Sequence, residues 1–152
     1  MLMFYYQLIE FNQLTKRDRT MTGNNFPTQS LYTGVGIIDN QHQTFFAILH
    51  KIRKLSQEND CGSFGDILEE LQLYSRFHFE TEETIMETAG AENLQAHKME
   101  HKKFIEKIEE LVLQNILEDP CFPEELASFV EKWLVDHILN TDKLDLADIS
   151  AE

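Results

Sequence analysis

The middle of the chain reads Arg76-Phe77-His78-Phe79-Glu80-Thr81-Glu82-Glu83, a polar stretch inside a segment with helical spacing. Around it, a set of residues recurs at intervals of three or four positions: Ile67, Leu71, Tyr74, His78, Glu82 and Met86. In an α-helix such positions share one face, so His78 and Glu82 lie one turn apart at the centre of an apolar face. A buried carboxylate needs a positive partner. A metal ion suits both side chains, because imidazole and carboxylate are natural metal ligands.

The rest of the sequence contains three further segments with helical spacing and no strand-like alternation of useful length. We predict helices over about residues 39–59, 64–88 and 93–117 and from Pro123 onward, with Asp39 as the first N-cap and Gly90 ending the second helix. Amphipathic helices joined by short loops become antiparallel neighbours. The predicted fold class is therefore all-α, an up-down-up-down antiparallel four-helix bundle with an N-terminal arm.

Length and composition restrict the possible partners. The 152 residues suit one domain, and the net charge of −14 argues against nucleic acid binding, which needs clustered Lys and Arg. No run approaches the roughly 18 apolar residues of a membrane span, so we expect no membrane insertion. Cys61 and Cys121 are too few for a disulfide framework, and we interpret them as free thiols in a reducing cytoplasm. A regulatory cysteine pair is the alternative.

We divide the chain into residues 1–33, an N-terminal arm or extension, and residues 34–152, the bundle. The arm is expected to lie across the bundle, anchored by Phe26, Leu31 and Tyr32, and Met21 is an alternative start.

Every predicted helix carries ligand-type side chains on its apolar face. They are His42 on the first helix, His78 and Glu82 on the second, His97 and His101 on the third, and His137 on the fourth. Asp142 follows His137 by five residues, about 140° round the helix away from it, so it faces the core only if the helix ends or opens near Asn140-Thr141. A single histidine on an apolar helix face usually has a purely structural role. Burying all of these groups unpaired would cost several kcal/mol each, which favours a metal site.

Seven ligands exceed the four of a structural zinc site. They suit two metal ions about 3.5 Å apart that share the two carboxylates. A set rich in imidazole favours iron over magnesium or calcium. His50 lies eight residues after His42, roughly 80° round the helix from it, and we leave it out of the ligand set as a residue at the flank of the bundle.

These motifs resemble the hemerythrin family in its bacterial form. The resemblance covers about residues 34–142 and rests on Gly36–His42, the HxxxE spacing of His78 and Glu82, the HxxxH spacing of His97 and His101, and the HxxxxD spacing of His137 and Asp142. It implies that one iron takes His42 and His78 and keeps an open position. The other iron takes His97, His101 and His137, and the two ions are bridged by Glu82, Asp142 and an oxo or hydroxo group.

The resemblance also implies a function, reversible dioxygen binding at a non-haem di-iron centre for oxygen delivery, storage or sensing, without enzymatic activity. Such a function needs a dry pocket. The side chains placed to line it are Phe45, Phe79, Trp133, Leu134 and Ile138, which serve equally as bundle core.

Two alternatives have other chemistry. A di-iron redox enzyme (oxidase, peroxidase or nitric oxide-reactive) of the ferritin-like class uses paired Glu-x-x-His motifs, and no histidine here has Glu three residues before it. A haem bundle with two axial histidines leaves Glu82 and Asp142 unexplained. Any protein partner is unknown from the sequence.

Overall fold

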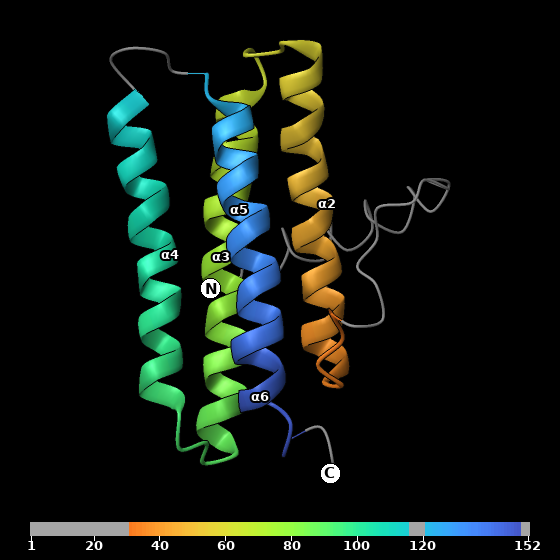
Figure 1. Ribbon diagram of the computed structural model, residues 1–152, viewed down its shortest axis with the longest axis vertical. Helices are drawn as coiled ribbons and strands as arrows, with labels where there is room; N and C mark the ends of the chain where they lie inside the picture. The colour runs from red at the N-terminus through yellow and green to blue at the C-terminus, as the bar shows by residue number, and fades with distance from the viewer. Residues whose placement is uncertain (1–30, 116–120, 150–152) are drawn as a thin grey trace, which may run out of the picture.

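The computed structural model describes residues 31–115 and 121–149, and over these residues the chain is an antiparallel helical bundle without strands (Figure 1). Its elements are α2 (Gly36–Glu58), α3 (Phe64–Thr88), α4 (Leu94–Asn115), α5 (Pro123–His137), the π-helix η2 (Ile138–Asp142) and the short α6 (Lys143–Asp145). Successive long helices run in opposite directions (Figure 1). The predicted all-α bundle is confirmed.

The first helix begins earlier than the sequence indicates. It starts at Gly36, and Asp39 lies inside its first turn, so the prediction of Asp39 as N-cap is wrong. The buried Asp39 carboxylate instead accepts hydrogen bonds from the backbone N–H of Thr33 (2.7 Å), the Thr33 hydroxyl (2.9 Å) and the backbone N–H of Gly34 (3.1 Å). Asp39 therefore fastens the preceding segment to the helix.

Two helices end in the left-handed backbone conformation. Asn59 follows α2 with φ 51°, and the N–H of Asp60 donates to the carbonyl of Leu55 at 3.0 Å. Gly90 follows α3 with φ 69°. Glycine adopts this region without steric cost, so the predicted stop at Gly90 is confirmed.

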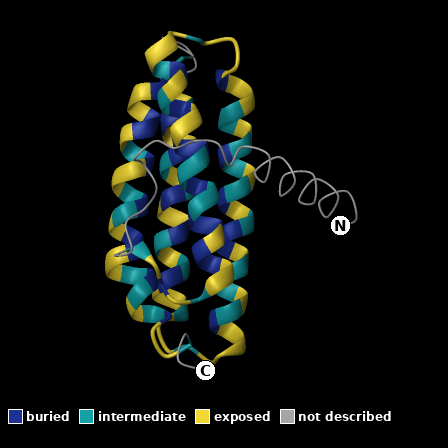
Figure 2. Cartoon of the chain, turned by 90° about the vertical axis from the view of Figure 1, so that its right-hand side faces the viewer, coloured by how far each residue is buried: buried dark blue, intermediate teal, exposed yellow. Residues whose placement is uncertain are grey.

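The main core lies along the bundle axis, where the dark-blue stripes of the helices meet in Figure 2. Its largest fully buried members include Phe45, Ile48, Ile52, Leu71, Phe104, Ile108, Leu126, Leu134 and Ile138. Each such side chain contributes about 1.5–3 kcal/mol by leaving water. The predicted inward face of α3 is confirmed, although Ile67 and Tyr74 on that face are only partly buried.

Cys61 and Cys121 form a disulfide, so the prediction of free thiols is wrong. Cys61 lies in the connection between α2 and α3, and Cys121 lies just before α5. Figure 1 shows the α2–α3 connection and the start of α5 at the same end of the bundle. In an up-down-up-down bundle the first and third connections share an end, which brings together two cysteines 60 residues apart. Disulfides persist mainly in oxidising environments, so the inference of a reducing cytoplasm loses its basis.

Residues 1–30 lie outside the described part of the chain, and so does the predicted anchor Phe26. Leu31 packs against the main core as predicted. Tyr32 does not, because it is 43% exposed and its hydroxyl accepts only a long hydrogen bond from Gln43 (3.5 Å). Among the described residues, no helix combines the length and apolar character needed to cross a membrane.

Candidate metal centre

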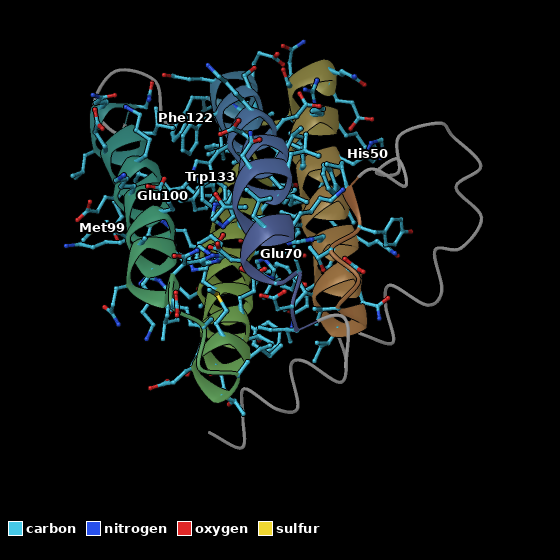
Figure 3. All side chains as sticks on the ribbon, turned by 60° about the horizontal axis from the view of Figure 1, so that its bottom comes forward. His50, Glu70, Met99, Glu100, Phe122 and Trp133 are labelled. Carbon is cyan, nitrogen blue, oxygen red and sulfur yellow. A yellow bond between two sulfur atoms is a disulfide. The ribbon has the colours of Figure 1, made fainter. Side chains whose placement is uncertain are left out.

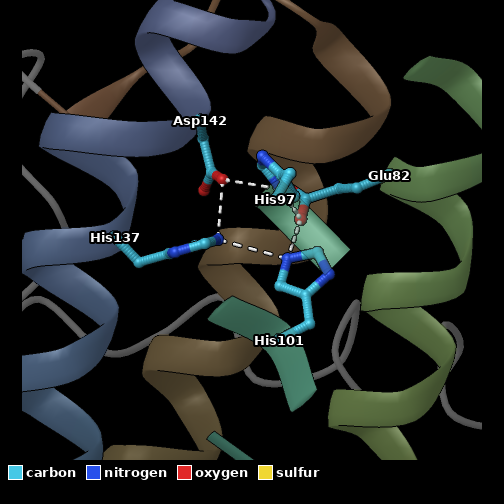
Figure 4. Close-up of side chains that lie close together, drawn as sticks. All are labelled: Glu82, His97, His101, His137 and Asp142. Carbon is cyan, nitrogen blue, oxygen red and sulfur yellow. Dashed lines mark hydrogen bonds and ion pairs between the residues drawn. The ribbon is translucent and has the colours of Figure 1, made fainter. Parts of the chain in front are cut away.

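The structure brings all seven predicted ligand side chains together in the bundle interior, where each is at most 4% exposed. They form two adjoining groups that share Glu82, and within each group the candidate ligand atoms lie within 4.8 Å of one another. The two-His group consists of His42, His78 and Glu82; the three-His group consists of Glu82, His97, His101, His137 and Asp142. Figure 4 shows the three-His group, with the five side chains pointing toward a common centre.

Glu82 turns one oxygen to each group. Its Oε1 atom lies 3.5 Å from Nε2 of His42 and 3.5 Å from Nε2 of His78. Its Oε2 atom lies 3.1 Å from Nε2 of His101 and 3.6 Å from Nε2 of His97. One carboxylate thus spans both groups, as a bridging ligand must.

Asp142 has the same divided arrangement. Its Oδ2 atom lies 3.3 Å from Nε2 of His42, whereas Oδ1 lies 3.0 Å from Nε2 of His137 and 3.4 Å from Nε2 of His97. Two carboxylates from different helices therefore connect the same two groups of imidazoles. This geometry suits a pair of metal ions.

A widened turn of helix places Asp142 in the site. The chain continues from α5 into the π-helix Ile138–Asp142 without a break. The i→i+5 hydrogen bonding of a π-helix lets residues five apart share a face, so Asp142 joins His137. The sequence expectation that the helix opens here is confirmed.

Most of the candidate ligand atoms lack a hydrogen-bond partner among the described residues. Among the described residues, the buried side-chain atoms without a hydrogen bond are Nδ1 and Nε2 of His42, both oxygens of Glu82, Nε2 of His97 and both oxygens of Asp142. Buried polar atoms are normally satisfied, and each exception costs about 1–3 kcal/mol. All but Nδ1 of His42 belong to the ligand atoms of the two groups. A cation held by imidazole and carboxylate would satisfy them, and this donor set fits iron.

Three of the predicted ligand histidines donate a hydrogen bond from Nδ1–H, on the side of the ring away from the site, to a side-chain oxygen. The Nδ1 atom of His78 lies 2.9 Å from Oε1 of Gln41, that of His97 lies 2.9 Å from Oδ2 of Asp145, and that of His101 lies 2.9 Å from Oε1 of Glu83. An Nδ1–H held in this way leaves the Nε2 lone pair for a metal.

None of these three acceptors is among the residues predicted from the sequence. The available signal was position, because Gln41 and Glu83 are chain neighbours of predicted ligands and Asp145 lies three residues after Asp142.

Burial and charge oppose one another in the site. Burial, the largest single influence, lowers the pKa of His42 and of His97, but hydrogen bonds and attraction to nearby carboxylates outweigh it and raise both pKa values to about 9. Burial lowers the pKa of His78 to about 4. Burial raises the pKa of Glu82 and of Asp142, yet the surrounding histidines hold both below their ordinary values. Without a metal, the carboxylates attract protons to the imidazoles; a metal would replace those protons.

Aromatic rings cover two of the three imidazoles in the three-His group. Phe79 stacks on His101 with ring centroids 3.9 Å apart, and Trp133 stacks on His137 at 4.3 Å. On the side of the two-His group, the ring of Phe45 lies 5.4 Å from that of His78, edge to face.

All five predicted pocket residues belong to or pack against the main core, and Trp133 alone among them is only partly buried. Their role in lining an oxygen pocket stays a prediction. His50 is exposed on the outer side of α2 (Figure 3), outside both ligand groups, as expected.

These features define a class, the helical bundles that hold a cluster of histidine and carboxylate ligands able to bind metal. The chain matches the family model of the hemerythrin HHE cation binding domain over residues 33–148. It therefore belongs to the hemerythrin family. Hemerythrins are oxygen-binding proteins rather than enzymes, in agreement with the sequence expectation.

Curated relatives and solved structures agree with this assignment. The chain is 34% identical over 112 residues to a bacteriohemerythrin of Pseudomonas aeruginosa, covering 74% of this chain and 72% of that protein. It is 33% identical over 115 residues to a bacteriohemerythrin of Clostridium acetobutylicum, covering 72% and 89%. A crystal structure of wild-type hemerythrin superposes with a TM-score of 0.73 at 31% identity, covering 80% of this chain and 95% of that one.

Proposed function

We propose that the protein binds dioxygen reversibly at a non-haem di-iron centre, for oxygen delivery, storage or sensing. The observation that carries this proposal is the pair of carboxylates, Glu82 and Asp142. Each turns one oxygen to each histidine group, and neither accepts a hydrogen bond from the residues that the structure describes. Membership of the hemerythrin family supports the choice of iron and of dioxygen.

In this proposal His42 and His78 would hold one iron, and His97, His101 and His137 would hold the other. Glu82 and Asp142 would be shared by the two ions, together with an oxo or hydroxo group. The first iron has one imidazole fewer, and this difference would leave a position open for dioxygen. The iron pair supplies the electrons that reversible oxygen binding requires.

The residues around the site hold the ligands and exclude water. Outward hydrogen bonds to Gln41, Glu83 and Asp145 direct three imidazoles inward. Phe45, Leu134 and Ile138 are buried in the main core, and apolar side chains at an oxygen site reduce access of water and protons.

The donor set favours oxygen binding over the enzymatic alternative. Five imidazoles and two carboxylates meet in the site, whereas ferritin-like di-iron enzymes use carboxylate-rich Glu-x-x-His pairs. A haem ligated by two histidines would leave Glu82 and Asp142 without a role.

The deciding experiment is an oxygen titration of iron-loaded protein. Metal analysis should give about two irons per chain and little zinc. The anaerobically reduced protein should gain a visible absorption on adding oxygen and lose it again under argon, through several cycles. A zinc-loaded sample is the control and should show no such change. An iron content near one, or oxidation that argon does not reverse even once, would rule out the proposal.

A further inference from the structure

The acceptors behind the ligand histidines differ in charge between the two groups. In the three-His group, His97 donates to the carboxylate of Asp145 and His101 donates to the carboxylate of Glu83, each at 2.9 Å. Both acceptors are carboxylate oxygens. They stand on the outer side of the imidazoles, opposite the metal-binding nitrogens.

The two-His group has no carboxylate in that position. His78 donates to the side-chain oxygen of Gln41, a neutral amide, at 2.9 Å. The Nδ1 atom of His42 is buried and has no hydrogen-bond partner in the described part of the chain. The difference is therefore two charged acceptors against one neutral acceptor.

Additional contacts hold each acceptor in place. Asn93 donates to the second oxygen of Asp145 at 3.1 Å. The Gln41 amide N–H donates to the hydroxyl of Thr81 at 3.3 Å, and that hydroxyl donates to the carbonyl of Phe77 at 2.8 Å, which fixes the amide with its oxygen toward His78. The acceptors are thus oriented parts of the site.

Glu83 has a further connection to solvent. Its second oxygen lies 3.8 Å from Nζ of Lys98. Together with Phe79, Glu80 and His101, these residues line an open cavity of about 270 Å³ between α3 and α4. The Glu83 side chain is partly exposed.

We propose that Glu83 and Asp145 are positioning residues that make the three-His metal position richer in electron density than the two-His position. This inference rests on the proposed di-iron function. A carboxylate that accepts the N–H of a ligand imidazole raises the basicity of that imidazole and strengthens its bond to the metal. The effect favours the ferric over the ferrous state. It would act on two ligands of the iron in the three-His group, His97 and His101, and on no ligand of the iron in the two-His group.

The general surface charge cannot produce this difference. Most of the other acidic side chains in the described part of the chain are exposed, and water and salt screen exposed charges beyond about 8–10 Å. A carboxylate hydrogen-bonded directly to a ligand is screened far less. Glu83 and Asp145 would therefore add to the difference that the third imidazole already gives the three-His position.

The test uses the charge-neutral, shape-conserving variants Glu83→Gln and Asp145→Asn in the full chain. Glu80→Gln is the matched control, because Glu80 lines the same cavity on α3 and is exposed. Binding of Co²⁺ to the metal-free protein is followed anaerobically by visible absorption, and the midpoint potential of the iron-loaded protein is measured by spectroelectrochemistry. Thermal unfolding checks that each variant is folded.

Each neutral variant should bind Co²⁺ about tenfold more weakly than the wild type. If the ferric form loses about tenfold in affinity relative to the ferrous form, the midpoint potential should rise by about 59 mV. Glu80→Gln should match the wild type in both measurements. Folded Glu83→Gln and Asp145→Asn variants whose cobalt affinity and potential equal those of Glu80→Gln would overturn the inference.

The two proposals fail in different ways. The cobalt titration involves no oxygen, so it tests the role of the carboxylates even if the wild-type iron protein binds no dioxygen. Conversely, unchanged cobalt affinity and potential in the variants would leave the reversible oxygen spectrum of the wild type untouched.

Discussion

The Oδ1 atom of Asp142 lies 3.0 Å from Nε2 of His137, although five residues separate them within one continuous run of helix. An ordinary α-helix would turn the two side chains about 140° apart. The π-helical turn removes this offset, so the last ligand of the site depends on a local departure from α-helical hydrogen bonding. Glu82, the other shared carboxylate, needs no such departure because it lies four residues after His78 on a regular helix.

Removing Glu82 should cost the protein much of its iron. Glu82→Ala takes away the carboxylate that spans both groups, and we expect clearly fewer than two irons per chain. The matched control is His50→Ala on the exposed side of α2, which should retain about two. Metal analysis of both purified proteins is the measurement, and a similar loss of iron in the two variants would contradict the assignment of the ligands.

Truncating Leu134 should shorten the life of the oxygenated form without removing a ligand. Leu134 is 1% exposed and lies one turn before His137 on α5. Leu134→Ala should retain iron and lose about 2–5 kcal/mol of unfolding free energy. Its oxygenated form should decay to the di-Fe(III) state several times faster than that of the wild type, because water and protons gain access to the site.

The control for this variant is Leu126→Ala, an equally buried residue of the same helix two turns further from the ligand. It should be destabilised to a similar extent with an unchanged decay of the visible absorption at matched pH. If both variants decay at the same rate, Leu134 is core packing only.

Opening the disulfide should lower stability and leave the metal site intact. Closing a loop of 60 residues restricts the unfolded chain, which corresponds to about 4 kcal/mol in the chain-entropy account. The double variant Cys61→Ser, Cys121→Ser should therefore unfold at lower denaturant concentration while binding two irons. Chemical denaturation with and without a thiol reductant measures this, and wild type insensitive to the reductant would argue against the bond.

The metal-free protein should become less stable as the pH rises from 6.5 to 9. His42 and His97 have pKa values raised from 6.5 to about 9 in the folded protein. A raised pKa means that the folded state binds the proton more tightly, so the stabilisation is complete below pH 6.5 and is lost as the pH rises through about 9. The depressed pKa values of Glu82 and Asp142 act only at acidic pH.

Bound Zn²⁺ should reverse this trend, because the metal requires deprotonated imidazoles. The increase in melting temperature caused by Zn²⁺ should therefore grow between pH 6.5 and 9. Calorimetry of metal-free and zinc-loaded protein at several pH values provides the comparison. A metal-free melting temperature that rises over this range would refute the assignment of the imidazole protons.

The bundle and its ligands could be predicted because both follow from periodicity. Apolar residues recur every three or four positions on four segments, and six of the seven predicted ligands, all except Asp142, occupy positions in those series. His78 and Glu82 are informative for this reason, since polar side chains on an apolar helix face need a partner. Even the opening of the helix before Asp142 follows from requiring that carboxylate to face inward.

The remaining features depend on three-dimensional neighbours that periodicity does not encode. Glu83 and Asp145 have the spacing of ordinary surface residues, and only the packing of α3 against α4 and the position of α6 bring them to ligand histidines. Asp39 has the residue type of an N-cap, but its hydrogen bonds run backward to Thr33 and Gly34. The disulfide requires knowledge of which loops share an end.

The disulfide also has a topological consequence. The bond between Cys61 and Cys121 closes a covalent ring that contains α3 and α4, and with them His78, Glu82, His97 and His101, four of the seven ligand side chains. In an unfolded but oxidised chain these four side chains remain on one ring, so once one of them has captured a metal ion the others are held at a higher effective concentration. His42, His137 and Asp142 lie on the two tails outside the ring, and the ring would thus gather more than half of the centre before either tail docks.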